Sequence, residues 1–104
     1  MPQHIPDTIK KGEIIILVFE IDSTQEKWSD YDKIISKNEK NKAHEFQHLD
    51  DRLSFTKCRS VLRSTLSKWL NCNPNEINII HRENGKPYLE HSKGIEFNLS
   101  LIHI

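Results

Sequence analysis

Residues 50–70, DDRLSFTKCRSVLRSTLSKWL, are the stretch of sequence that decides the fold. The apolar residues of this stretch recur at helical spacing and fall on one stripe: Phe55, Cys58, Leu62, Leu66 and Trp69. The acidic pair at the start suits the positive end of a helix dipole. The segment 71–75, NCNPN, contains Pro74, which cannot continue a helix. We therefore predict one long helix over residues 50–70, with one face packed on a core.

Three arginines form a second stripe on the same predicted helix. Arg52, Arg59 and Arg63 are turned by roughly 60–70° from the apolar stripe, because each residue advances a helix by about 100°. They are therefore expected at the rim of the surface on which the helix packs. Two interpretations stay open for them, salt bridges to Asp and Glu side chains or cations offered to a phosphate-bearing ligand.

The N-terminal part of the chain contains a polar tail and an apolar run. Residues 1–12 are polar and interrupted by prolines, which is typical of a tail. Residues 13–22, EIIILVFEID, are rich in β-branched residues and bounded by turn formers, so they predict a buried strand. The apolar run inside it, residues 14–19, is too short to cross a bilayer.

Two shorter helices are predicted between this strand and the long helix. Ser23 with Glu26, and Ser36 with Glu39, have the spacing of capping boxes that begin helices. Apolar residues follow at helical spacing in both segments. In the first segment they are Trp28, Tyr31, Ile34 and Ile35, and in the second they are Ala43, Phe46 and Leu49.

The last third of the chain alternates between strand-like runs and turns. The runs are residues 77–82, 88–89 and 95–100, separated by polar turns at 83–87 and 90–94. The order of one strand, three helices and further strands predicts an α+β domain. We expect a small antiparallel sheet with three helices packed on one side.

Composition limits the function classes. The chain has 104 residues, enough for one small domain, and 15 Lys and Arg balance 15 Asp and Glu. This balance argues against a nucleic-acid binder, which needs a surplus of cations. Cys58 and Cys72 are the only cysteines, and there is no signal peptide or membrane span. We therefore expect a reduced, cytoplasmic protein with no membrane partner.

A basic turn and the strand after it carry the functional signal. Gly85, Lys86 and Pro87 place a cation at a tight turn, which can present backbone N–H groups and an ammonium to a phosphate. A plain hairpin turn with a solvated lysine is the alternative for this motif alone, and the Asn84-Gly85 pair supports a hairpin in either case. A spacer of seven residues separates NGKPYL from residues 97–100, FNLS.

These pieces together resemble the N-terminal half of the 4′-phosphopantetheinyl transferases of the surfactin-synthetase-activating type, in the holo-[carrier protein] synthase superfamily. The resemblance covers residues 13–100 and rests on the order of short motifs. The motifs are a strand ending near Asp22, a polar helix with Ser36 and Phe46, Asp51-Arg52 with Phe55, Arg59, Leu62 and Arg63, then Gly85-Lys86-Pro87 and Phe97-Asn98-Leu99-Ser100. The resemblance implies one half of a pseudo-dimer with coenzyme A between its two halves.

The resemblance also implies a reaction and its binding residues. The family moves the phosphopantetheine arm of coenzyme A, with the help of Mg²⁺, onto a serine of an acyl- or peptidyl-carrier protein in fatty acid, polyketide or nonribosomal peptide biosynthesis. By motif match, Lys86 and Pro87 would contact the nucleotide end of coenzyme A. Ser100 would lie against its phosphates, and Lys42 would reach its 3′-phosphate. Asn98 completes this predicted coenzyme-binding set, and no catalytic residue is implied in this chain.

Two departures from the family pattern bear on this prediction. Leu101 stands where the family has a histidine that contacts the coenzyme, and His103 lies two residues further along. The family's metal ligands are an Asp-x-Glu and a later Glu in a second half, and no such motif follows Ser100. We therefore expect residues 13–104 to be a single N-terminal subdomain, truncated before the metal-binding half and inactive alone.

Two other residue pairs could hold a metal ion, but both are incomplete. Glu20 and Asp22 share one face of the predicted strand, yet two carboxylates do not complete a hard-cation site. His44 and His48 have the i, i+4 spacing of a chelating pair, but no third ligand has a suitable spacing. A solvated helix face is the favoured interpretation of the histidines, and no metal site is predicted.

A second function class stays open. Residues 95–104, IEFNLSLIHI, are apolar and alternating, and such a strand needs a neighbour to satisfy its backbone. The chain could therefore be a non-catalytic interaction module that self-associates or docks on a partner through this strand and the arginine-rimmed helix.

Overall fold

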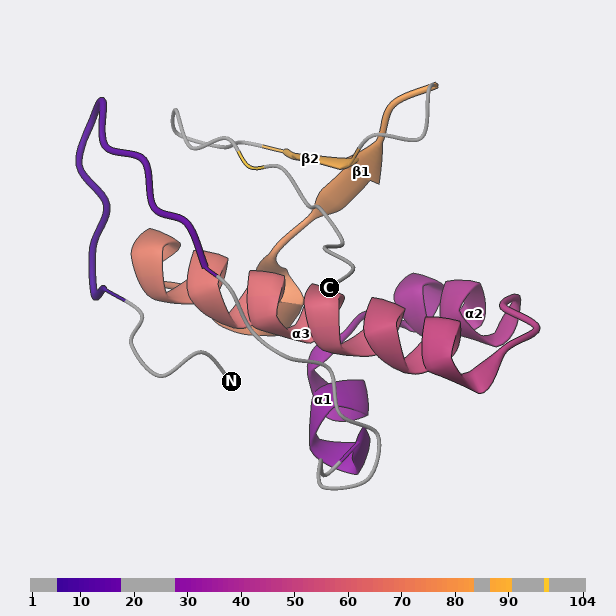
Figure 1. The fold of residues 1–104 in the computed structure, drawn as a ribbon. Helices are drawn as coiled ribbons and strands as arrows, with labels where there is room; N and C mark the ends of the chain where they lie inside the picture. The colour runs from indigo at the N-terminus through magenta and orange to yellow at the C-terminus, as the bar shows by residue number, and fades with distance from the viewer. Residues whose placement is uncertain (1–5, 18–27, 84–86, 91–96, 98–104) are drawn as a thin grey trace.

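The computed structural model describes residues 6–17, 28–83, 87–90 and 97, and the structural statements below concern these residues. Three α-helices, a short 3-10 helix and two strands follow one another in this part of the chain (Figure 1). They are α1 (Trp28–Ile34), α2 (Lys37–His44), α3 (Leu49–Leu70), η1 (Pro74–Glu76), β1 (Ile79–His81) and β2 (Pro87–Leu89). The predicted α+β fold, with three helices and a small antiparallel sheet, is confirmed.

Helix α3 is the element on which the others pack. It confirms the long helix predicted from its apolar stripe. Leu62 and Leu66 are 9% and 1% exposed, and they form a core cluster with Ile77 and Leu89. In Figure 1, α3 crosses the middle of the molecule, with the β1–β2 hairpin above it and α1 below it.

The end of α3 is determined by local chemistry. Asn71 adopts a left-handed conformation with φ of 54°, which asparagine tolerates better than most residues. The N–H of Cys72 then donates to the carbonyl of Ser67 at 3.0 Å. Pro74 lies at the start of η1, where its missing N–H costs nothing, so the predicted helix stop is confirmed.

The β1–β2 hairpin packs against the core cluster of α3. Its antiparallel register pairs Ile79 with Leu89, Ile80 with Tyr88 and His81 with Pro87. Ile79 and Leu89 pack with the core cluster, as does Phe97 beyond the hairpin. The guanidinium of Arg82 lies 4.8 Å from the ring centroid of Tyr88. The predicted runs 77–82 and 88–89 are therefore confirmed as strands; β1 is shorter than its run, whereas β2 is one residue longer, because Pro87 begins β2 instead of ending the turn.

Helices α1 and α2 both pack on α3. The capping box of α2 is confirmed, because the hydroxyl of Ser36 accepts from the N–H of Glu39 at 3.1 Å and the Glu39 carboxylate accepts from the N–H of Ser36 at 2.8 Å. The predicted box at Ser23 and Glu26 lies outside the described residues. Leu49 is 61% exposed, so its predicted inner position is wrong. The reason is that α2 ends at His44, and Leu49 begins α3.

The predicted N-terminal strand is not formed over residues 13–17. These residues have no strand partner among the described residues, and Ile14 and Ile16 are 86% and 81% exposed. β-branched residues favour extended backbone, but a buried strand also needs a neighbour. The rest of the predicted strand, residues 18–22, lies outside the described residues.

The described part of the predicted tail is held against the end of α3. The indole N–H of Trp69 donates to the carbonyl of Pro6 at 2.9 Å, and Lys68 pairs with Asp7 at 3.0 Å. Gly12 has φ of 82°, a left-handed turn conformation that favours glycine. Among the helices that the structure describes, none has both the length and the apolar character needed to cross a membrane.

Candidate functional site

A buried ionic cluster joins α2 to α3. Arg63 donates from Nε to Oε1 of Glu39 at 2.6 Å, and Nη1 of Arg59 lies 3.7 Å from the other carboxylate oxygen. All three residues are at least nine-tenths buried, with exposed fractions of 6% for Glu39, 6% for Arg59 and 3% for Arg63. Two cations share one anion, so the cluster carries a net positive charge.

The cluster corrects the expected place of the arginine stripe. Arg59 and Arg63 do not lie at an open rim, because α2 and the segment leading into β1 cover them. Arg63 donates from Nη1 to the carbonyls of Pro74 at 3.0 Å and Ile77 at 2.6 Å. The salt-bridge interpretation is confirmed for Arg59 and Arg63, with Glu39 as the partner. Arg52 instead donates to the carbonyl of Phe46 at 3.2 Å.

Arg59 also contacts His81 at the end of β1. Its Nη2 lies 2.8 Å from Nε2 of His81. A guanidinium can only donate, so Nε2 must accept and the imidazole proton must lie on Nδ1. The pKa of His81 is below its ordinary value because of partial burial and the positive charges of Arg59 and Lys42, against the opposing charge of Glu39. Burial likewise lowers the pKa of Arg59, while Glu39 raises it.

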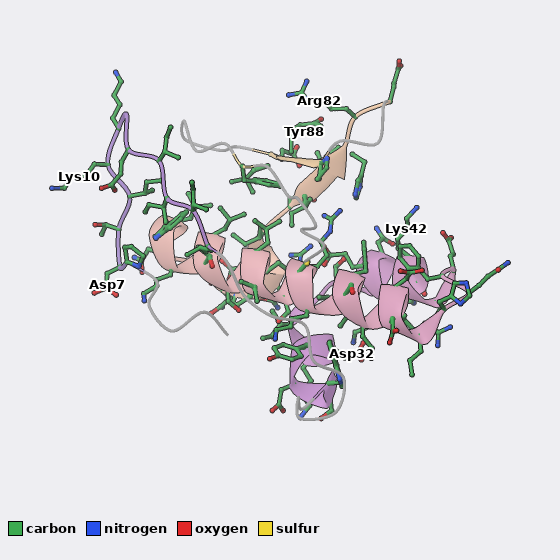
Figure 2. All side chains as sticks on the ribbon, in the orientation of Figure 1. Asp7, Lys10, Asp32, Lys42, Arg82 and Tyr88 are labelled. Carbon is green, nitrogen blue, oxygen red and sulfur yellow. The ribbon has the colours of Figure 1, made fainter. Side chains whose placement is uncertain are left out.

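Lys42 is the predicted site residue whose positive charge acts on this histidine. It projects from α2, its side chain is 57% exposed, and its ammonium lies 3.8 Å from Glu45. Its charge acts on His81, which pairs with Pro87 across the hairpin. Figure 2 shows Lys42 on the upper edge of α2, whereas Asp32 lies below α3 on α1. We refer to Lys42, Arg59 and His81 as the cationic patch.

Of the five predicted coenzyme-binding residues, Pro87 pairs with His81 across the hairpin, and Lys42 acts on His81 through its charge. The others, Lys86, Asn98 and Ser100, lie outside the described residues, as does His103. Phe97 is described and packs against the core cluster.

The predicted chelating histidines lie at the surface. His44 ends α2, His48 precedes α3, and both are exposed. In the part of the chain that the structure describes, no three His, Cys, Asp or Glu side chains gather in a way that could hold a metal ion. The described residues therefore do not fit the Mg²⁺ that the resemblance implies, while Glu20 and Asp22 lie outside them.

Comparison with known families decides the relationship of this chain. The family model described as 4′-phosphopantetheinyl transferase, N-terminal, matches residues 20–103. The chain belongs to this family. Phosphopantetheinyl transferases use coenzyme A and act on carrier proteins. A search of curated proteins and a search of solved structures each found no match.

Two residues of this phosphopantetheinyl transferase domain escaped the sequence prediction. Glu39 was expected only as a helix cap, and His81 only as part of a strand. The i, i+4 spacing of Arg59 and Arg63 on a helix rich in apolar residues was a signal that a carboxylate should cover them. The position of His81 just before the basic turn was the available signal for its place in the site.

Proposed function

We propose that this chain supplies the N-terminal coenzyme A-binding surface of a phosphopantetheinyl transferase of the surfactin-synthetase-activating type. The enzyme would transfer 4′-phosphopantetheine from coenzyme A to a serine of an acyl- or peptidyl-carrier protein. The observation that carries the proposal is the 2.8 Å contact between Arg59 and His81, which brings the end of β1, and with it the paired Pro87 of β2, against the arginines of α3; the charge of Lys42 on α2 acts on the same histidine. The family match over residues 20–103 supports it.

The chemistry of the reaction explains why such a patch is needed. A serine oxygen attacks a phosphorus of the coenzyme A pyrophosphate, and adenosine 3′,5′-bisphosphate leaves. Catalysis of this kind depends on positioning and on stabilising charge at the phosphates. In the proposal, Lys42 binds the 3′-phosphate and Lys86 with Pro87 binds the nucleotide end. The proposal also assigns Ser100 to the phosphates and includes Asn98 in the coenzyme-binding set.

Since no group of side chains among the described residues could hold a metal ion, the proposal assigns Mg²⁺ to ligands elsewhere in the complete enzyme. Mg²⁺ would neutralise charge on the pyrophosphate in the complete enzyme. This chain alone should therefore bind coenzyme A but convert no apo carrier protein in the presence of coenzyme A and Mg²⁺. Ready conversion to the holo form would contradict this assignment.

Replacing Lys42 by alanine tests the binding role directly. Loss of one charge-assisted hydrogen bond should weaken coenzyme A binding by about tenfold, measured by isothermal titration calorimetry. Dephospho-coenzyme A, which lacks the 3′-phosphate, should bind both proteins equally. Lys40→Ala is the matched control, because Lys40 is on the same helix but pairs with Asp32 of α1 at 3.9 Å. If Lys42→Ala weakened the binding of coenzyme A and of dephospho-coenzyme A equally, the assignment of Lys42 to the 3′-phosphate would be refuted.

A non-catalytic interaction module is the second candidate function. The observation that favours it is the exposure of Ile14 and Ile16, at 86% and 81%, on a segment outside the helices and strands that the structure describes. Exposed apolar residues on an unpaired segment can pair with another copy. Size-exclusion chromatography at several concentrations separates the two candidates. Dimerisation that Ile14→Lys abolishes would support the module, and a monomer at all concentrations would exclude self-association.

A further inference from the structure

We propose that His81 is a further anion-binding residue of this site, and that Arg59 is the positioning residue that makes it a hydrogen-bond donor toward the ligand. This inference rests on the proposed function, because the anion is taken to be the phosphate that Lys42 binds. It assigns a role to the strand β1, which none of the predicted coenzyme-binding residues occupies.

The first step is the tautomer of the ring. Arg59 is buried on α3, with Glu39 3.7 Å from Nη1 and the ring centroid of Phe55 5.2 Å from its guanidinium carbon, so its Nη2 approaches His81 from a defined direction. The 2.8 Å contact occupies Nε2 as an acceptor. The remaining proton must therefore be on Nδ1, and the imidazole of His81 makes no other hydrogen bond within the described part of the chain. Nδ1–H is a donor available to a ligand.

The second step is the charge around that donor. Three cations are paired with two carboxylates here. Glu39 pairs with Arg59 and Arg63, and Glu45 pairs with Lys42. Glu39 is buried between the arginines, whereas Glu45 is a surface partner of Lys42 at 3.8 Å, with its side chain 71% exposed. An exposed pair of this kind contributes little, so an anion can replace Glu45 at low cost. The net charge that remains attracts an anion to Lys42 and His81.

The third step is the buried guanidinium behind the ring. Nη1 of Arg59 is buried and has no hydrogen-bond partner in the described structure, since Glu39 lies 3.7 Å away. Its charge is thus only partly neutralised by Glu39. Arg59 is buried, whereas His81 is exposed at the end of β1, so the guanidinium charge polarises the ring from its inner side and strengthens the donor on its outer side. Arg59 is thus a positioning residue, which acts on the ligand through the neutral ring of His81.

The experiment combines nitrogen NMR of the imidazole with binding to histidine variants. In the free wild-type chain at pH 7.5, the ¹⁵N spectrum should show His81 with its proton on Nδ1 and a non-protonated Nε2. Coenzyme A should shift the Nδ1 resonance. His81→Ala should weaken coenzyme A binding by about tenfold, as expected for one lost hydrogen bond to a charged group. His81→Gln keeps an acceptor for Arg59 and an N–H donor, and should bind within about threefold of wild type.

His44→Ala is the control, since His44 is exposed and lies outside the cationic patch. It should bind coenzyme A as the wild type does. Circular dichroism of each variant verifies that it is folded, and a structural role for His81 alone would not shift Nδ1 when ligand is added.

Inorganic phosphate separates this inference from the proposed function. If phosphate shifts Nδ1 while coenzyme A does not bind, the proposed function fails and the anion-binding role of His81 stands. If coenzyme A binds with the expected dependence on Lys42 but Nδ1 does not respond, the proposed function stands and the inference is overturned. A proton on Nε2 in the free chain, or no response to either anion, also overturns it.

Discussion

Replacing Glu39 by glutamine is expected to lower the free energy of unfolding by about 3 kcal/mol, the cost of removing one partner from a buried ion pair. Arg63 would lose its 2.6 Å charged partner, and Arg59 would lose the only carboxylate near its buried Nη1 in the described structure. Glutamine keeps an oxygen that can accept from the N–H of Ser36, so the helix cap is preserved. The decrease in the free energy of unfolding therefore reports what the negative charge of Glu39 contributes. Urea unfolding followed by circular dichroism gives the free energy.

Asp32→Asn is the matched control for this substitution. It removes a carboxylate of a surface pair with Lys40, and its side chain is 56% exposed. Such pairs contribute about 0–1 kcal/mol, so the control should lie close to wild type. A loss in Glu39→Gln no larger than in the control would show that the two arginines do not depend on Glu39.

A second large loss is expected for Leu66→Ala. Leu66 is 1% exposed and lies in the cluster that joins α3 to the hairpin. Truncating a leucine in such a core removes buried apolar surface and leaves a cavity, which together cost about 3 kcal/mol. Because Ile77 and Leu89 pack on the same cluster, the hairpin that carries His81 and Pro87 should be weakened with the core.

Leu49→Ala tests whether this loss arises from burial. The substitution is chemically identical and lies on the same helix, but Leu49 is 61% exposed. Its free energy of unfolding should stay within about 0.5 kcal/mol of wild type, as for most surface substitutions. Equal losses in the two variants, measured by urea unfolding, would contradict the core described above.

Several elements followed from local patterns in the sequence. Helix α3 was predicted from its apolar stripe and its stop at Pro74, and the α2 cap from Ser36 and Glu39. The β1–β2 pair was predicted from the polar turn between the strand-like runs 77–82 and 88–89. Each of these depends on residues close together in the chain. Local spacing is therefore enough to specify them.

The prediction failed where burial depends on distant partners. Ile14 and Ile16 have the composition of a buried strand, but composition does not supply a neighbouring strand. Leu49 fitted the inner stripe of α2, but that helix ends before it. In the candidate site, Lys42 and Pro87 were named by motif matching, whereas His81 was not and became a candidate only through its contact with Arg59.

The long helix α3 was determined by the sequence alone, since the stretch from residue 50 to 70 contains its own period, charge order and stop signal. Only the tertiary structure decided what its arginines do. Glu39 and Arg63 are 24 residues apart, and Arg59 and His81 are 22 apart. A buried cation requires a compensating anion, and a histidine tautomer depends on the donor that faces it. Neither condition is encoded by spacing along a helix, because both depend on the packing of α2 and β1 against α3.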